Sequence, residues 1–141
     1  MTENFAHRGF SAAYPENTML AFQKAAEAGC HGIEMDLHLT ADGVLVVIHD
    51  ETLERTTGSA GWVGDTSFAR LRQLDASYRF AGENKKNPIP ALEEVLEWCK
   101  GTDLRLNLEL KTNVREYPGI EQKTVDLITR MGMERRVILS S

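Results

Sequence analysis

Strand-like and helix-like segments alternate along this 141-residue chain, and the alternation limits the folds it can form. Short apolar runs typical of strands are expected at residues 5–7, 32–39, 44–48, 104–110 and 136–139. Apolar residues at helical spacing lie between them, at residues 18–29, 90–101 and 119–131. A strand that returns parallel to its neighbour needs a long connection, which is almost always right-handed. The sequence therefore predicts a parallel α/β sheet with the core pattern (βα)₃β.

Two segments depart from the simple alternation. The Asp42-Gly43 pair is a strong tight-turn signal and joins the strand at 32–39 to the apolar extension at 44–48. Residues 50–88 contain several glycines, a short helical piece after Thr66 and a long polar run. We expect this stretch to be an inserted segment.

Charged residues recur within the predicted strands. Glu34 and Asp36 are two residues apart and so share one face, and Glu109 and Lys111 share a face by the same rule. In an open sheet covered by helices on both faces, such charges are costly unless a metal or ligand neutralises them. In a barrel they can line the open end of the interior, where barrel enzymes place their chemistry.

The first fifty residues add two histidines and an arginine, in His7-Arg8 and His49-Asp50. A divalent cation needs hard oxygen ligands, and a phosphodiester needs a positive group to bind its charge. Departure of the alcohol needs a proton donor that titrates near neutrality, as imidazole does. These residue types together are the inventory of a metal-assisted phosphate ester hydrolase.

Composition excludes several other classes of protein. The chain is 42% hydrophobic and 26% charged, which is ordinary for a globular domain, and its net charge of −5 argues against nucleic acid binding. The start lacks a basic region followed by an apolar run, so we expect no signal peptide, no membrane anchor and a cytoplasmic location. Cys30 and Cys99 lack metal-ligand spacing and are expected to be packing residues.

The sequence resembles the N-terminal half of a glycerophosphodiester phosphodiesterase of the bacterial cytoplasmic type. The motifs that carry the resemblance occur in order and include His7-Arg8-Gly9, Pro15-Glu16-Asn17-Thr18, Gly32-Ile33-Glu34-Met35-Asp36, Thr40-Ala41-Asp42-Gly43, His49-Asp50, Leu53-Glu54-Arg55-Thr56-Thr57, Ile89-Pro90-Ala91-Leu92 and Asn107-Leu108-Glu109-Leu110-Lys111. The resemblance implies a TIM-barrel (β/α)₈ fold. Residues 1–141 would be the N-terminal part of that single domain, with the inserted segment at about 50–88 and the C-terminal half absent.

The resemblance also implies a reaction and roles for individual residues. A divalent metal, Ca²⁺ or Mg²⁺, would assist hydrolysis of a small glycerophosphodiester, such as glycerophosphocholine or glycerophosphoethanolamine, to glycerol 3-phosphate and an alcohol. The implied site consists of metal ligands Glu34, Asp36 and Glu109, catalytic histidines His7 and His49, and phosphate-binding residues Arg8 and Lys111.

Other polar residues near these motifs have simpler explanations. Glu16 and Asn17 are expected to be structural, because helix capping and the placement of an acid near a helix N-terminus account for them. A supporting contact to the site residues is the alternative. His38 shares the face of Glu34 and is expected to be a contact at the rim of the site. For Arg55, ordering of a loop and contact with substrate remain equal alternatives.

Two other functions remain open on the sequence. A complete barrel of this kind needs roughly 250 residues, so this chain would leave open sheet edges. A non-catalytic half-barrel that binds metal weakly, or that self-associates through those edges, is therefore one alternative. Within enzymes, a phospholipase of the sphingomyelinase D type is the other, although the Leu53–Thr57 motif and the long insertion favour the glycerophosphodiesterase.

Overall fold

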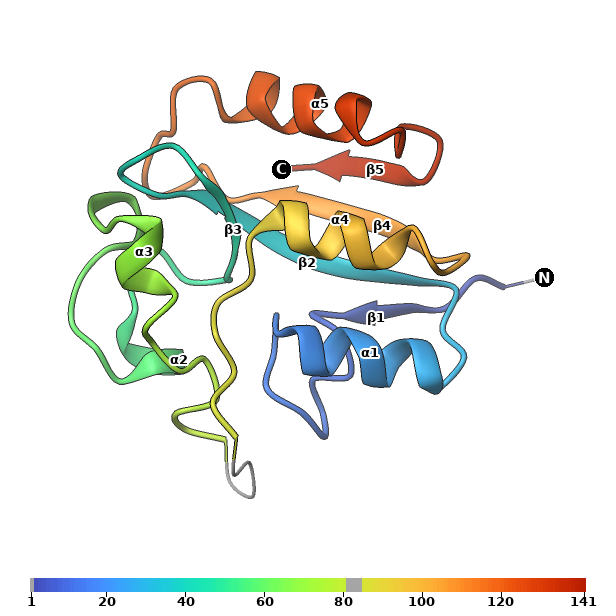
Figure 1. Cartoon of the computed structure of the whole chain (residues 1–141), viewed down its shortest axis with the longest axis horizontal. Coiled ribbons are helices and arrows are strands. Elements are labelled where there is room, and N and C mark those ends of the chain that lie inside the picture. The colour runs from blue at the N-terminus through green and yellow to red at the C-terminus, as the bar shows by residue number, and fades with distance from the viewer. Residues whose placement is uncertain (1, 81–84) are drawn as a thin grey trace.

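Four parallel strands form the centre of the computed structural model, which describes residues 2–80 and 85–141. The strands are adjacent in chain order, β1 (Phe5–His7), β2 (Gly32–Leu39), β4 (Arg105–Leu110) and β5 (Val137–Ser140) (Figure 1). Three helices separate them, α1 (Met19–Glu27), α4 (Leu92–Cys99) and α5 (Ile120–Arg130). The predicted parallel α/β fold with its (βα)₃β order is confirmed.

A fifth strand, β3 (Leu45–Val47), runs antiparallel to β2. Leu37 pairs with Val47 on one side and with Leu110 of β4 on the other, so β3 lies along the edge of β2 that β1 leaves free. Gly43 has a φ of +78°, which glycine adopts without strain and which closes the predicted turn. Because β3 stops beside the middle of the sheet, the residues that follow it begin close to the carboxyl end of β2.

The predicted insertion contains two short helices, α2 (Glu54–Thr57) and α3 (Phe68–Leu71), and a 3₁₀ turn, η1 (Val63–Asp65). Its apolar side chains form a small core of their own with β3 and the residues before α4; the members are Val46, Ile48, Leu53, Val63, Leu71, Leu74 and Ile89. Residues 81–84 of the insertion, like Met1, lie outside the described residues. In its described part, the predicted insertion therefore packs against β3 and the residues that follow it.

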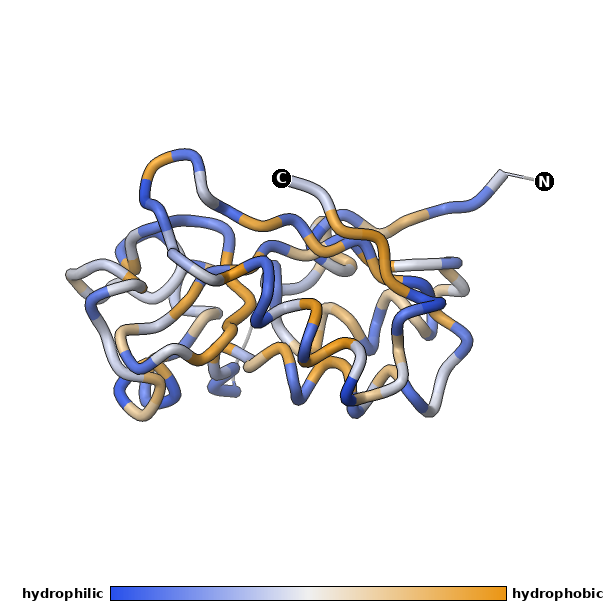
Figure 2. The backbone as a smooth tube through the Cα atoms, turned by 90° about the horizontal axis from the view of Figure 1, so that it is seen from above, coloured by the Kyte–Doolittle hydropathy of each residue, from blue (hydrophilic) through white to orange (hydrophobic). Residues whose placement is uncertain are grey.

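The larger core lies between one face of the sheet and the three long helices. Every second residue of β2 and β4 points into it and is buried, and so are the inner faces of the helices; the members include Ile33, Met35, Leu37, Leu106, Leu108, Phe22, Val95, Leu96 and Leu127. Hydrophobic and hydrophilic stretches alternate along the coils in Figure 2, which fits helices with one buried side. The opposite face of the same strands is left to the polar residues.

The last strand, β5, pairs with β4 along one edge within the described part of the chain. Ile138 and Leu139 on this strand are 43% and 40% exposed. Self-association through such an edge stays a prediction. Among the described residues, each helix is too short or too polar to cross a membrane.

Candidate active site

Three carboxylates meet on the polar face of the sheet because of the strand register. Asp36 of β2 pairs directly with Glu109 of β4, and Glu34 lies two residues before Asp36 on the same face. One carboxylate oxygen from each of the three lies within 4.8 Å of the others. The structure therefore brings together the three acids that the sequence resemblance implies as metal ligands.

Two of the three acids in this cluster are largely buried. The side chains of Glu34 and Asp36 are 13% and 1% exposed. Burial, together with the nearby charge of Asp36, raises the pKa of Glu34 to about 7. Glu34 Oε1 and Asp36 Oδ1 are buried and lack a hydrogen-bond donor in the described structure. Buried oxygens without a donor are costly, and hard cations bind such ligands, so the donor set fits a divalent cation.

Two basic side chains flank the carboxylates. Arg8 Nε lies 3.6 Å from Asp36 Oδ2, and Lys111 Nζ lies 3.6 Å from Asp36 Oδ1 and 2.9 Å from Glu109 Oε1. The hydrogen bond that Lys111 donates to Glu109 is the main reason that the pKa of Glu109 is lowered. Both basic side chains are mostly buried, 21% and 14% exposed, so their charges are less screened by water than at the surface.

The backbone beside Asp36 is strained at two positions. Arg8 and Asn17 have φ angles of 58° and 54°, and they are the non-glycine residues with positive φ in the described chain. Both side chains reach Asp36, since Asn17 Nδ2 donates to Asp36 Oδ2 at 3.0 Å. Thr18, and not Asn17, caps α1, by accepting from the N–H of Ala21. Asn17 therefore orients Asp36, a contact that favours the supporting role over helix capping.

The two predicted catalytic histidines flank the cluster from different elements. His7 ends β1 next to Glu34 in the register, and its Nε2 lies 3.6 Å from Glu34 Oε2. His49 follows β3, and its Nδ1 lies 2.8 Å from Asp50 Oδ1. His7 is 67% exposed and His49 is 30% exposed, so both rings are accessible from solvent. Five of the predicted site residues lie at or just beyond the carboxyl ends of β1, β3 and β4, and these are His7, Arg8, His49, Glu109 and Lys111. The other two, Glu34 and Asp36, lie within β2, where they pair with His7 and Glu109.

Arg55 from the insertion joins two acidic residues beside His49. Its guanidinium donates to both oxygens of Asp50, at 2.8 and 3.1 Å, and to both oxygens of Glu16, at 2.6 and 3.0 Å. Glu16 also lies 3.4 Å from Arg8. A planar fork suits such paired carboxylates, so the contacts support the loop-ordering alternative for Arg55. Glu16 belongs to this ion-pair network as well.

Removal of the Arg55 guanidinium is expected to raise the pKa of Asp50. The hydrogen bonds from Arg55 are the main cause that lowers this pKa from 3.8 to about 2. An acid with a lowered folded pKa contributes stability above pH 3.8, and this contribution is lost as pH falls through about 2. In Arg55→Met, NMR titration of the Asp50 carboxyl should give a pKa closer to 3.8.

The matched control is Arg70→Met, which removes an exposed arginine elsewhere in the insertion and should leave Asp50 unchanged. An unaltered Asp50 pKa in Arg55→Met would show that the fork does not hold this carboxylate in solution.

His38 is placed differently from the rim contact that its position suggested. Its side chain is fully buried, and both ring nitrogens are in hydrogen-bond contact, Nδ1 with Tyr117 Oη at 2.8 Å and Nε2 with the His49 carbonyl at 2.9 Å. The shared face with Asp36 was the available signal in the sequence. Tyr117 carried no such signal, because its contact depends on how the loop after β4 folds back.

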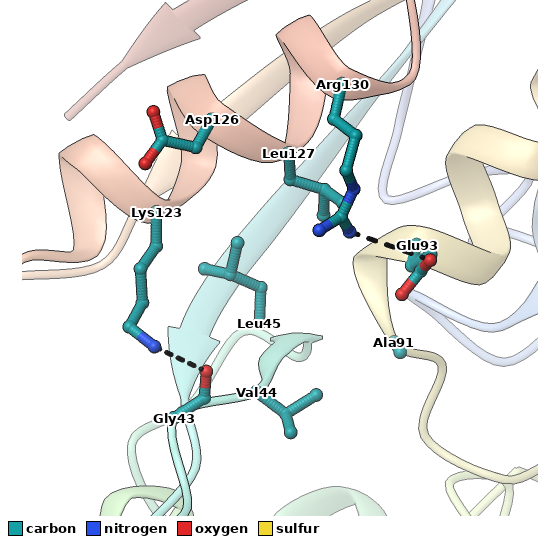
Figure 3. A pocket seen from close by; sticks show the side chains of 9 residues that line it. All are labelled: Gly43, Val44, Leu45, Ala91, Glu93, Lys123, Asp126, Leu127 and Arg130. Atoms are coloured by element: carbon teal, nitrogen blue, oxygen red, sulfur yellow. Dashed lines mark hydrogen bonds and ion pairs between the residues drawn. The ribbon is translucent and has the colours of Figure 1, made fainter.

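A separate groove of about 330 Å³ lies on the outer side of the molecule, between α4, α5 and the turn before β3 (Figure 3). Its charged groups are already engaged, since Lys123 donates to the Gly43 carbonyl at 3.2 Å and Arg130 lies 3.7 Å from Glu93. None of the seven predicted site residues lines it. The predicted site residues therefore lie apart from this groove.

Comparison with known proteins identifies the family. A sequence profile described as the glycerophosphoryl diester phosphodiesterase family matches residues 7–141. A glycerophosphodiester phosphodiesterase of Bacillus altitudinis is 49% identical over 142 residues, which cover 100% of this chain and 58% of that protein. A relative from Caldanaerobacter subterraneus with the same name is 46% identical, over 96% of this chain and 56% of that protein.

Solved structures agree with this match. The crystal structure of a glycerophosphodiester phosphodiesterase from Agrobacterium tumefaciens superimposes with a TM-score of 0.89 at 37% identity, over 99% of this chain and 57% of that one. The chain thus spans somewhat more than half the length of the relatives that it matches, and the predicted partial TIM-barrel architecture is confirmed. It belongs to the glycerophosphoryl diester phosphodiesterase family.

Proposed function

We propose that this chain supplies the metal-binding and acid–base residues for hydrolysis of glycerophosphodiesters, such as glycerophosphocholine or glycerophosphoethanolamine, to glycerol 3-phosphate and an alcohol. The observation that carries the proposal is the carboxylate cluster of Glu34, Asp36 and Glu109, with basic side chains beside it and two buried oxygens without donors. A site that binds a cation and then an anion needs this combination of charges.

Glu34, Asp36 and Glu109 would hold the divalent cation. When bound, a cation here would offset the charge that develops at phosphorus and lower the pKa of a coordinated hydroxyl. Ca²⁺ and Mg²⁺ both accept an all-oxygen ligand set. Asn17 keeps Asp36 oriented through its hydrogen bond at 3.0 Å, so this ligand is positioned before a metal arrives.

Arg8 and Lys111 would bind the phosphate. Arg8 lies 3.6 Å from Asp36 Oδ2, and Lys111 lies 3.6 Å from Asp36 Oδ1. A substrate phosphate would share the positive charge of these two side chains with Asp36. Arg8 presents a planar guanidinium suited to two phosphate oxygens, whereas Lys111 acts as a point charge. Together they would hold the diester against the cation site and reduce repulsion between the substrate and the carboxylates.

His7 and His49 would transfer the protons. The pKa of Asp50 is lowered to about 2, so Asp50 is an acceptor at neutral pH and the Nδ1 of His49 is the donor in their 2.8 Å contact. This leaves the Nε2 of His49 as the atom that can give or take a proton. One histidine would deprotonate a glycerol hydroxyl that attacks phosphorus, and the other would protonate the departing alcohol oxygen. Attack of water on the resulting cyclic phosphate would then give glycerol 3-phosphate.

Relatives support the choice of substrate. A phosphodiesterase from Oleispira antarctica was crystallised with the product sn-glycerol-3-phosphate, and it matches this chain with a TM-score of 0.81 at 32% identity, over 99% of this chain and 57% of that one. The names of the relatives favour a glycerophosphodiesterase over a sphingomyelinase D-type phospholipase. The matched span, 58% of one relative, makes the activity of the whole barrel part of the proposal.

A coupled assay for glycerol 3-phosphate release from glycerophosphocholine tests the proposal. It is run with Ca²⁺ or Mg²⁺ and with chelator, on this chain and on the chain joined to the second half of a relative's barrel. We expect metal-dependent release that the chelator abolishes. Activity in the joined form alone would assign this chain the role of a catalytic half, and absence of release in both forms would contradict the proposed reaction.

Metal affinity is expected to depend on pH through Glu34. Its pKa of about 7 means that a cation must displace a proton from this carboxyl below that pH. Affinity for Ca²⁺ should therefore fall roughly tenfold for each pH unit below about 7 and level off above it. Because the folded pKa is raised, the metal-free protein should also lose stability as pH rises from 4.5 to about 7.

Calorimetric titration with Ca²⁺ across this range measures the dependence, and repetition in buffers of different ionisation enthalpy counts the protons released. Affinity that stays constant between about pH 5 and 7 would show that Glu34 is already ionised or does not bind the cation.

A further inference from the structure

His38 is a buried polar residue that the proposed reaction does not use. Like Glu34 and Asp36, it lies on β2 and faces the polar side of the sheet. Its side chain has no exposed surface. Tyr117 is 7% exposed, and its ring meets that of His38 edge-on at an interplanar angle of 86°. Both hydrogen-bonding atoms of the imidazole are engaged, so the ring is fixed in orientation.

The partners of the ring determine its tautomer. The carbonyl of His49 can accept but not donate, so Nε2 of His38 must carry the proton in the 2.9 Å contact. In a neutral ring, Nδ1 is then the acceptor for the hydroxyl proton of Tyr117 at 2.8 Å. Burial lowers the pKa of His38 and raises that of Tyr117 to about 12, which agrees with a neutral imidazole and a neutral phenol.

The His49 carbonyl that His38 binds lies just past the end of the pairing between β2 and β3. The β2–β3 pairing finishes at Leu37 and Val47, and Ile48 N–H still donates to the Asp36 carbonyl at 3.0 Å. His49 is the next residue. Its carbonyl bonds to Nε2 of the His38 side chain, where a continued strand pairing would supply a backbone N–H. At its ring, His49 is held by Asp50. Backbone and ring of His49 are therefore fixed by separate contacts.

We propose that His38 is a positioning residue for His49, and that Tyr117 fixes the His38 ring for this task. The inference rests on the proposed function, in which His49 transfers a proton. His38 also connects His49 to Tyr117, which lies in the loop that follows β4, the strand that carries Glu109. A small displacement of a proton-transfer group costs a large factor in rate, so this support should matter for turnover more than for binding.

NMR of the histidine side chains in the whole chain tests the positioning directly. In the native protein, long-range ¹H–¹⁵N spectra should show His38 protonated at Nε2 and not at Nδ1. His38→Leu and Tyr117→Phe should broaden or multiply the His49 ring signals. His38→Gln should keep a single set, because its amide nitrogen can replace Nε2 as donor to the carbonyl. His31→Gln, at an exposed histidine bonded to Asn4, is the matched control and should change nothing at His49.

The same variants give a kinetic test in the metal-dependent assay. His38→Leu should lower kcat by about 10- to 100-fold with little change in KM, and His38→Gln should restore most of the loss. In a His49→Ala background, His38→Leu should cause no further loss, because it acts through the removed ring.

A His38 protonated at Nδ1, or an undisturbed His49 ring in both His38→Leu and Tyr117→Phe, would overturn the inference. Tyr117→Phe removes a single hydroxyl, so it keeps the test valid if His38→Leu does not fold. The NMR result does not require turnover. A missing phosphodiesterase activity would therefore contradict the proposed function alone, and normal NMR spectra in the variants would contradict the positioning role alone.

Discussion

Replacement of His49 by alanine is expected to abolish turnover while the affinity for the divalent cation stays the same. The loss should be about 10²- to 10⁴-fold in kcat, the usual contribution of a positioned acid or base. The reason is the geometry at its ring, where Asp50 occupies Nδ1 at 2.8 Å and leaves Nε2 for the substrate. The carboxylate cluster does not include His49, so its ligands remain intact.

Two measurements on the same variant check this expectation, glycerol 3-phosphate release and calorimetric titration with Ca²⁺. His31→Ala is the matched control, since it removes an exposed histidine that contacts the backbone of Asn4 and lies outside the cluster. Unchanged activity in His49→Ala would remove this residue from the mechanism. Lost metal affinity would instead show that His49 contributes to the cation site.

Replacement of Glu34 by alanine is expected to remove both metal affinity and activity. Glu34 supplies a carboxylate oxygen to the cluster, and its Oε1 is a buried atom without a donor in the described structure. Loss of one of three anionic ligands should weaken cation binding by roughly 100-fold or more, which corresponds to about 3 kcal/mol. The metal-free variant should fold at least as well as the native protein, because a buried acid with a raised pKa has been removed.

Calorimetry, activity and thermal unfolding in the absence of metal separate these effects. Glu97→Ala, at an acid of α4 that pairs with Lys100 at the surface, is the matched control and should leave all three unchanged. Native metal affinity in Glu34→Ala would exclude this residue as a ligand. A large loss of metal-free stability would assign the cluster a structural role that the proposal does not include.

The sheet and the carboxylate cluster could be predicted because both follow from local pattern. Alternation of polar and apolar residues places Glu34 and Asp36 on one face of β2 whatever the neighbours are, and parallel pairing then brings Glu109 beside them. The Asp42-Gly43 signal likewise predicts the turn before β3 from two residues. These features depend on the two-residue repeat of a strand and on the residue preferences of a tight turn, and both can be recognised in the sequence.

The supporting contacts could not be predicted, because each joins segments that are distant in the sequence. Arg55 reaches Glu16 across 39 residues, and His38 reaches Tyr117 across 79. Such contacts depend on how the insertion and the loop after β4 pack against the strand ends. Asn17 illustrates the same limit, since the helix-start motif left capping and support of the site as alternatives. The fold decides between them, because a left-handed backbone turns its amide toward Asp36.

A crystal structure of the chain with Ca²⁺ and glycerol 3-phosphate would show directly where the cation and the phosphate bind. We expect one cation within about 2.6 Å of oxygens from Glu34, Asp36 and Glu109, with the phosphate between that cation and the side chains of Arg8 and Lys111. A cation bound away from the three carboxylates, or a phosphate bound away from both basic residues, would contradict this expectation.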